Sequence, residues 1–515
     1  PIHTQPAHNM RPTNIYFCPK PGKLWQLWPV YTGIWVNREL PGKVSAQMTR
    51  EAAIDRAHRY FDDSHGYWSD LARRVSIPTE SQNPESLKIL YKYLDDEMRN
   101  SFEAMDYTCK VYDNPMDGMG PVLLATRIED ENFPTLLGYG HGDVVRGYEG
   151  QWAKNRNPWE LDRDGDRVYG RGTADNKGQH SIHIEALNSV IQERGYLGFN
   201  SKFIIEMGEE NGSWGFKDLV AQNKDDFAAD MFFASDGPRV DTTRPNLTLG
   251  SRGAQNFDLV LDMREGGHHS GNWGGILANP GIILGNAIAT IADQNGKILV
   301  EGWRPPPISN SVREALKTVS REGGIDAPEI NSDWGEPGLT EAEKVYAWNT
   351  FEVLAFVTGN PEKPVNAVPP KAHANCQLRY VVGTNAENII PALRKHLDKQ
   401  GFNMVKIGQP PAENSGRFHA ARTDPDHPWA IWMQETVGRM TGEKTLVLPN
   451  SGGSICNDVF QDVLGLPFVW MPLSYTGCSQ HAPNEHILWS LTREGIGLVT
   501  GVYWDLGDPA TAYQT

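Results

Sequence analysis

The sequence has few cysteines, no long apolar run and fewer basic than acidic residues, and each shortage excludes a class of protein. The five cysteines are odd in number and lack CxxC spacing, which argues against a disulfide framework or a thiolate zinc site. A reducing, cytoplasmic compartment is the simpler expectation. No run of about 18 apolar residues is present, so we expect no membrane span and no membrane partner. No signal peptide is visible, although the chain begins at Pro1 without a Met.

Charge and composition describe an acidic, folded protein. The 48 basic and 64 acidic residues leave a net charge of −16, which repels polyanions and makes nucleic acid a poor candidate partner. Hydrophobic residues make up 39% of the chain, enough apolar surface to exclude disorder over most of its length. A length of 515 residues predicts about three domains, or two larger ones.

Residues 1–48 differ from the rest of the chain. They are rich in Pro, Trp and Tyr and show no clear periodicity. We interpret them as an extended N-terminal arm that packs on the body through Trp25, Trp28 and Trp35. Their role stays open between covering a cleft and extending a dimer contact.

Beyond the arm, helical patterns alternate with short apolar runs. This alternation is typical of an α/β domain in which helices flank a mostly parallel sheet. The expected helices are 50–74, 86–98 and 178–194, and the expected strands are 122–125, 135–139, 203–207 and 231–234.

The pattern changes near Asn246, where an insertion is expected. Residues 247–263 alternate as a strand with one exposed face, and a helix is expected at about 280–292. Two more strands are expected, at 351–356 and 374–382. We therefore predict an inserted α+β domain over 248–383, with the main domain formed by residues 49–247 and 384–515.

Five segments place His, Asp or Glu at expected strand ends or at a helix start, where open α/β sheets bind ligands. Together they offer two His and three or four carboxylates, a nitrogen and oxygen ligand set that suits a pair of Zn²⁺, Mn²⁺ or Co²⁺ ions. The segments are 140–143, 169–178, 206–212, 234–237 and 479–485.

Single residues in these segments also have ordinary explanations. His141 taken alone is more often structural, and the adjacent Glu209 and Glu210 more often form a solvated face. At strand ends those explanations weaken. Asp143 is placed to hold the His141 imidazole in one tautomer, and one glutamate can bind metal while the other takes a proton from water. The glycines of 169–178 fit neither GxGxxG nor GxxxxGK[ST], which argues against a nucleotide site.

The ordered set of motifs resembles the M20 family of metallopeptidases, and within it the carnosinase-like dipeptidase branch. The resemblance covers roughly residues 50–515 and implies a catalytic α/β domain split by a lid domain, with a homodimer formed through that lid. The motifs that carry it are Gly-His-Gly-Asp-Val-Val at 140–145, Tyr-Gly-Arg-Gly-Thr-Ala-Asp-Asn-Lys-Gly at 169–178, Glu-Glu at 209–210, Ser-Asp at 235–236, Arg-Gly at 252–253, His-Ser-Gly at 269–271, Gly-Gly-Ser-Ile at 452–455 and His481.

The resemblance also implies a dinuclear metal centre. It makes Asp175 the bridge between two ions. His141 and Asp236 would complete one ion, and Glu210 and His481 the other. Zn²⁺ is the first expectation, with Mn²⁺ or Co²⁺ as alternatives.

Catalytic and substrate roles follow from the same resemblance. Glu209 is implied as the general base and later the proton donor. His269 is implied as a lid residue that reaches, from the partner subunit, the oxyanion of the tetrahedral intermediate. Four residues are implied to contact the substrate: Arg379, Asn366, Gly453 and Ser454. The guanidinium fork of Arg379 suits a C-terminal carboxylate.

Three departures from the family pattern concern the substrate more than the metals. Asn176 stands where many members have a second Asp, and Asn366 stands where dipeptidases tend to have Thr. Asp236 is followed by Gly-Pro-Arg in place of the usual sequence. The expected metal ligands survive all three departures, whereas the identity of the substrate stays open.

Three functions are therefore compared. The first is a dinuclear metallohydrolase that cleaves the amide bond of a dipeptide or N-acyl amino acid with a free carboxylate. The second keeps the fold but makes the enzyme a hydrolytic deaminase for an aromatic or imino substrate, for which the 16 Trp leave room. The third is a metal-binding scaffold without turnover. Glu209 and His269 argue against it, because neither is needed merely to hold ions.

Overall fold

The computed structural model describes residues 48–319, 329–409 and 418–513. The expected N-terminal arm, with Trp25, Trp28 and Trp35, lies outside these residues. Within them, no helix combines the length and the apolar character that crossing a membrane requires.

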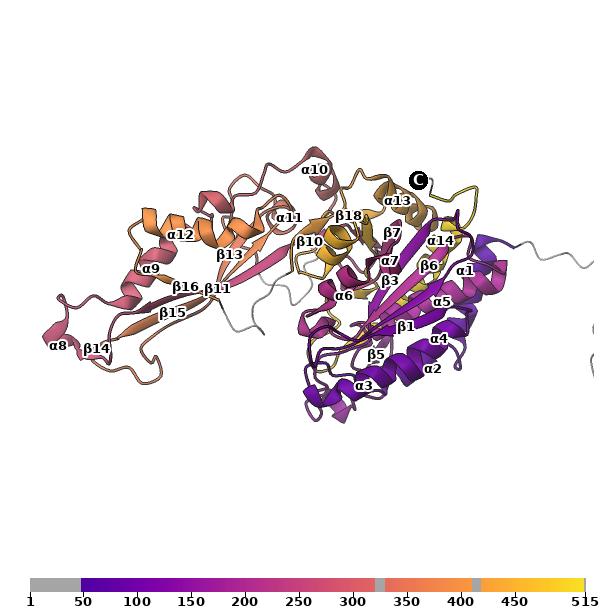
Figure 1. Cartoon of the computed structure of the whole chain (residues 1–515), viewed down its shortest axis with the longest axis horizontal. Coiled ribbons are helices and arrows are strands. Elements are labelled where there is room, and N and C mark those ends of the chain that lie inside the picture. The colour runs from indigo at the N-terminus through magenta and orange to yellow at the C-terminus, as the bar shows by residue number, and fades with distance from the viewer. Residues whose placement is uncertain (1–47, 320–328, 410–417, 514–515) are drawn as a thin grey trace, which may run out of the picture. The chain divides into compact units, whose positions relative to one another are not determined.

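The larger sheet has eight strands in the described chain, in the order β1-β2-β6-β3-β7-β19-β9-β18. Its strands β1, β6, β3 and β7 are labelled in Figure 1. Four of its seven neighbouring pairs run parallel, which confirms the predicted α/β fold with a mostly parallel sheet. Its strands are β1 (Thr108–Tyr112), β2 (Val122–Arg127), β3 (Thr135–His141), β6 (Asn200–Glu206), β7 (Met231–Ala234), β9 (Asn246–Thr248), β18 (Leu446–Leu448) and β19 (Phe468–Trp470).

Helices cover both faces of this sheet. Because successive side chains of a strand point to opposite faces, Phe203 and Ile205 of β6 join one buried cluster and Ile204 joins the other. Helices α1, α5 and α14 pack together over the first face, and α6 lies over the second. The helices of this layer are α1 (Arg50–Asp62), α2 (Tyr67–Val75), α3 (Leu87–Lys92), α4 (Arg99–Glu103), α5 (Lys177–Arg194), α6 (Phe216–Gln222), α7 (Lys224–Phe227), α13 (Pro428–Thr441) and α14 (Trp489–Leu506).

Two of the expected helices are divided. The helix expected over 50–74 is α1 and α2, separated at Gly66. A Cβ at that position would lie 1.9 Å from the carbonyl oxygen of Tyr60, so only glycine lets the chain turn there. The helix expected over 86–98 becomes α3, a π-helical segment at Tyr93–Met98 and then α4.

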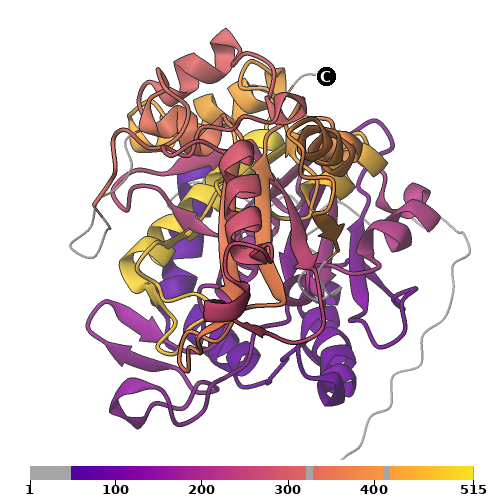
Figure 2. The ribbon, with the colours of Figure 1, turned by 90° about the vertical axis from the view of Figure 1, so that its left-hand side faces the viewer.

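The second sheet is antiparallel, in the order β13-β15-β11-β16. Helix α9 lies along one face of it, over β11 and β15 (Figure 2). Trp303, Phe257 and Leu378 are buried in its apolar core. The elements of this layer are β11 (Gly253–Asp262), α9 (Pro280–Ile291), β13 (Thr350–Thr358), β15 (Lys371–Tyr380), α12 (Ile389–Lys399) and β16 (Lys406–Gly408).

The limits of the insertion differ from those expected. The single strand expected over 247–263 is three strands: β9 in the first sheet, β10 (Gly250–Ser251), which pairs with β17 (Ala421–Arg422), and β11 in the second. The expected return to the main domain at residue 384 is too early. Helix α12 buries its apolar side chains in the second core, and β16 pairs with β11.

Short elements complete the described chain. Strands β12 (His268–His269) and β14 (Ala367–Val368) pair beyond the ends of β11 and β15, next to α8 (Ser270–Trp273). The others are β4 (Asp162–Asp164), β5 (Arg167–Tyr169), β8 (Pro238–Arg239), β20 (Ser474–Tyr475), β21 (His486–Leu488), α10 (Asn310–Leu316) and α11 (Glu341–Tyr346).

Candidate metal centre

The carboxylate of Asp175 lies between two imidazoles. Its Oδ1 is 3.0 Å from Nε2 of His141, and its Oδ2 is 3.0 Å from Nε2 of His481. His141 is the last residue of β3, Asp175 lies in the loop before α5, and His481 belongs to the turn before β21. Three segments that are distant in sequence therefore meet at one carboxylate.

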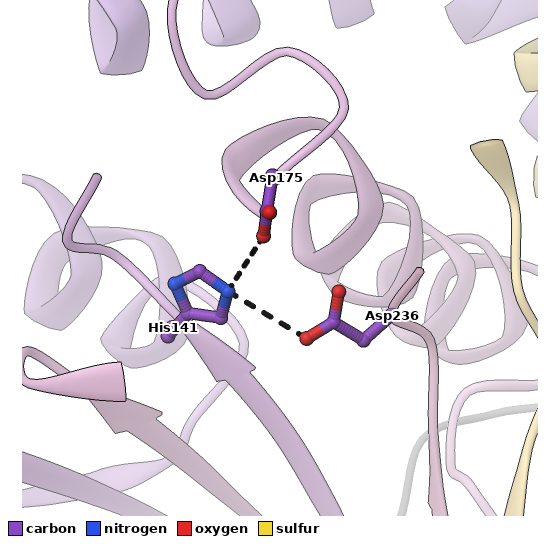
Figure 3. A group of neighbouring side chains, drawn as sticks. All are labelled: His141, Asp175 and Asp236. Atoms are coloured by element: carbon purple, nitrogen blue, oxygen red, sulfur yellow. Dashed lines mark hydrogen bonds and ion pairs between the residues drawn. The ribbon is translucent and has the colours of Figure 1, made fainter. Parts of the chain in front are cut away.

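One side of Asp175 forms a first ligand group. Figure 3 shows His141, Asp175 and Asp236 pointing toward one another, with Nε2 of His141 3.6 Å from Oδ2 of Asp236. Asp236 follows β7, which is parallel to β3. Because the carboxyl ends of parallel strands share one edge of a sheet, this strand order explains why the two residues meet.

The other side of Asp175 forms a second group, with Glu210 and His481. Oε2 of Glu210 is 3.1 Å from Nε2 of His481, whereas its Oε1 is buried and has no hydrogen-bond partner among the described residues. A buried carboxylate oxygen without a partner is costly unless a cation binds it. In each group the ligand atoms lie within 4.8 Å of one another, and the groups share Asp175. These residues therefore fit a pair of divalent ions.

Electrostatics favour cations at this place. Hydrogen bonds to Asp175 and Glu210 raise the pKa of His481 to about 11. Although burial opposes it, hydrogen bonds from the two histidines lower the pKa of the Asp175 carboxyl. The raised pKa of His481 and the lowered pKa of Asp175 both mark a place where the surroundings favour positive charge beside the carboxylates.

Glu209 lies beside the ligands without belonging to either group. Its Oε2 is 3.9 Å from Nε2 of His141. Burial raises the pKa of Glu209 well above its usual range, and the carboxylates of Glu210 and Asp236 raise it further. This environment suits a group that accepts and returns a proton.

Asp143 has a wider role than the one expected. Nδ1 of His141 lies 3.1 Å from the backbone carbonyl of Asp143 and 3.4 Å from its carboxylate. The carboxylate itself accepts hydrogen bonds from the backbone N–H groups of Glu209, at 3.3 Å, and Glu210, at 3.1 Å. Asp143 therefore orients the two glutamates as well as the imidazole.

A third group of possible ligands lies elsewhere in the described chain: His419, Asp458 and Asp462. There the ammonium of Lys217 is 2.8 Å from Asp458 and 3.6 Å from Asp462. A protein cation already balances this cluster, so it does not compete as a metal site.

A second constellation joins the two sheets. Nη1 of Arg379, on β15, donates to Oγ of Ser454 at 2.7 Å, and that hydroxyl donates to the carbonyl of Arg252 at 2.6 Å. Gly453 faces open space, since a Cβ there would meet nothing within 4 Å. Three of the four expected substrate contacts are thus brought together: Arg379, Gly453 and Ser454.

Arg252 received no role from the sequence, although Arg-Gly at 252–253 belongs to the family motifs. Its guanidinium donates to the carbonyl of Gly452 and to Oγ1 of Thr350. Burial, and then the neighbouring Arg379, lower the pKa of Arg252 to about 10. The described partners of both guanidinium groups are neutral oxygens, so the pair is suited to an anionic group.

His269 and Asn366 lie at a different place. His269 lies on β12, Asn366 immediately precedes β14, which pairs with β12, and the backbone carbonyl of Asn366 accepts a hydrogen bond from Ser270 N at 2.8 Å. Both side chains are exposed. Lys371 is eight residues of extended strand, roughly 27 Å, from Arg379, and β14 lies beyond it. Within one chain, His269 therefore does not lie beside Arg379.

An α/β sheet that gathers His, Asp and Glu ligands at its strand ends defines a metal-dependent hydrolase, and comparisons identify its family. Residues 137–504 match the model of peptidase family M20/M25/M40. The Beta-Ala-His dipeptidase of Rattus norvegicus is 30% identical over 473 residues, which cover 84% of this chain and 92% of that protein. The Cys-Gly metallodipeptidase DUG1 of Candida albicans is 32% identical over 397 residues, 71% of this chain and 77% of that protein.

A solved structure agrees. An M20 family metallo-carboxypeptidase from Sulfolobus solfataricus is 25% identical, covers 85% of this chain and 98% of its own, and has a TM-score of 0.70. The chain therefore belongs to peptidase family M20/M25/M40, which confirms the resemblance inferred from its motifs. It is a hydrolase of the metallopeptidase class.

Metal binding should stabilise the folded protein, because the ligands converge only in the folded state. With Zn²⁺ or Mn²⁺ at 100 times its Kd, the free energy of unfolding should rise by about 2.7 kcal/mol per site. Thermal unfolding combined with metal analysis should give two ions per chain. Asp175→Asn should remove most of the shift. Asp458→Asn, at the cluster balanced by Lys217, should leave the metal-dependent rise in stability unchanged. If only this control lost metal, the ions would bind at the Asp458 cluster and not at Asp175.

Proposed function

We propose that the chain is a dinuclear metallodipeptidase, which cleaves the amide bond of a dipeptide or N-acyl amino acid with a free carboxylate. The observation that carries the proposal is the pair of ligand groups sharing Asp175, with Glu209 beside them. The relatives named as Beta-Ala-His and Cys-Gly dipeptidases support a dipeptide as the first choice. Zn²⁺ is the expected metal, with Mn²⁺ or Co²⁺ as alternatives.

The residues divide the chemistry between them. His141 and Asp236 would hold one ion, Glu210 and His481 the other, and Asp175 both. When bound, the ions would polarise the substrate carbonyl and lower the pKa of the attacking water. Glu209 takes the proton of the attacking water at its carboxylate and later gives it to the leaving amine.

Substrate binding relies on the constellation that joins the two sheets. Arg379 and Ser454 would hold the substrate's carboxylate, with Gly453 leaving room for it. Arg252 supports them, because it holds the carbonyl of Gly452 and accepts the Ser454 hydroxyl at its own carbonyl. Anchoring one end of a short substrate fixes how far its amide bond lies from the anchor, which favours dipeptide-sized substrates.

Removing the proton acceptor should abolish turnover without removing metal. Glu209→Gln should lower kcat for a dipeptide by about 100-fold or more, because general acid–base catalysis contributes that much. Metal analysis should still give two ions per chain. Glu314→Gln, on the exposed part of α10, is the control. Full activity of Glu209→Gln with metal bound would refute the mechanism. If the wild-type enzyme released ammonia from a mixed panel of substrates but cleaved no dipeptide or N-acyl amino acid, deamination would be favoured instead.

The carboxylate anchor can be tested with paired substrates. Arg379→Lys keeps the charge but loses the guanidinium fork. For a dipeptide with a free carboxylate, KM should rise about 10-fold or more, as expected for a lost hydrogen bond between charged groups. For the C-terminally amidated dipeptide, KM should barely change. The control is Arg422→Lys on β17, whose partner is Asp424, and an equal effect on both substrates would assign Arg379 another role.

We also infer a homodimer through the second sheet. β13 is an edge strand, and four of its apolar side chains are 40–58% exposed. An apolar edge of this kind is a protein-binding surface unless it is covered. His269, which lies beyond the far ends of β11 and β15, would then stabilise the oxyanion in the partner subunit, and Asn366 would contact the substrate there. An oxyanion contact of this type contributes about 3 kcal/mol.

Mixed dimers distinguish action in trans from action in cis. Glu209→Gln and His269→Ala should each be inactive alone. Co-expressed, they should form heterodimers with one intact site, because the His269→Ala chain keeps Glu209 and receives His269 from its partner. Activity should return to about a quarter of the wild-type value when chains mix at random.

The matched control pairs Glu209→Gln with Asp175→Asn. Both changes lie in the metal-binding layer, so neither chain can complete a site and no activity should return. If the His269→Ala mixture also stays inactive although heterodimers form, His269 does not act in trans.

A further inference from the structure

Glu485 has a fully buried carboxylate that accepts four hydrogen bonds. Its Oε2 accepts from Nη1 of Arg171 at 2.7 Å and from N of Gly172 at 3.1 Å. Its Oε1 accepts from N of Ala174 at 2.9 Å and from N of Asp175 at 3.0 Å. The loop that presents Asp175 is thus wrapped around a side chain more than 300 residues away.

The same contact reaches the turn that carries His481. Nη2 of Arg171 donates to the carbonyl of Ala482 at 3.1 Å. Ser479, His481 and Asn484 have φ values of 58°, 59° and 67°, in the left-handed region that non-glycine residues rarely adopt. Such a conformation is unfavourable, so the turn persists only because its surroundings hold it.

We propose that Glu485 is a positioning residue that, together with Arg171, fixes Asp175 relative to His481 and so preforms the second ligand group. The inference rests on the proposed dinuclear function. Glu485 belongs to neither ligand group, and it would act through the two segments that it joins.

The effect should be larger on the second group. Asp175 belongs to both groups, but only the second group also takes His481, whose turn is held by Arg171. Its third member, Glu210, is held separately by Asp143. The first group draws His141 and Asp236 from strand ends that make no hydrogen bond with Glu485 in the described chain. Loss of Glu485 should therefore weaken binding of one ion much more than binding of the other.

Glu485→Gln tests the proposal, because it keeps the size of the side chain but turns an amide NH₂ toward hydrogen-bond donors. Stepwise Zn²⁺ binding, measured against a competing chelator, should show one binding constant reduced about 10- to 100-fold and the other changed much less. Raising the Mn²⁺ concentration should restore kcat for a dipeptide with KM unchanged. The matched control is Asp505→Asn on α14, which removes a buried carboxylate that pairs with Arg50 of α1 and Arg439 of α13 and should change neither constant.

A measurement on the wild-type protein covers the case in which Glu485→Gln fails to fold. In the metal-free protein, hydrogen exchange in the peptide 170–176 should be slow, because Glu485 holds the amides of this loop without help from an ion. Rapid exchange there would show that the loop is not preformed and would overturn the proposal. Two unchanged constants in a folded Glu485→Gln would overturn it as well, while leaving the dinuclear function intact. A wild-type protein that binds fewer than two ions would refute the proposed function and this inference together.

Discussion

The rest of the structure depends on the concentration of carboxylates around Asp175. Two unit charges 4.8 Å apart repel by about 3 to 4 kcal/mol at an effective dielectric constant of 20. Asp175, Asp236 and Glu210 therefore resist being brought together, and positive charge beside them offsets the repulsion. Divalent ions would supply that charge.

Holding these groups in place is the work of buried oxygens that accept backbone hydrogen bonds. Asp143 orients the segment of Glu209 and Glu210, and Glu485 orients the loop of Asp175. A buried carboxylate without such donors is costly in free energy. Moving either backbone segment away would therefore leave the carboxylate without its donors, and this cost holds the segment in place. Candidate ligands that are held in this way before an ion arrives would lower the entropic cost of binding it.

Features of the fold and of the candidate site could be predicted from the sequence where they depend on residues close together in the chain. Strand ends are local features, and parallel strands share an edge, so His141, Asp175, Glu210, Asp236 and His481 could be grouped as candidate ligands from pattern and motif. The contact between Glu485 and Arg171 joins residues 314 apart, and no local pattern reports it. The limit at residue 384 was wrong for a related reason. An amphipathic helix such as α12 shows that it covers a sheet, but not which of two sheets it covers.

Two departures from the family pattern differ in how far the structure explains them, Asn176 by its hydrogen bonds and Asn366 only by its position. Asn176 donates its side-chain amide to the carbonyl of Ser235 at 2.9 Å, next to Asp236, and its Oδ1 lies 3.3 Å from Nδ1 of His180. An ionised Asp at this position could not donate to that carbonyl, and it would add a further negative charge beside the bridging carboxylate. Asn176 therefore ties the Asp236 loop to the start of α5 while keeping the charge of the centre lower. Asn366, by contrast, is exposed at the far end of the second sheet, where the proposed dimer would decide its role. The candidate metal centre is thus assembled within one chain, whereas a contact of Asn366 with the substrate would require the proposed dimer.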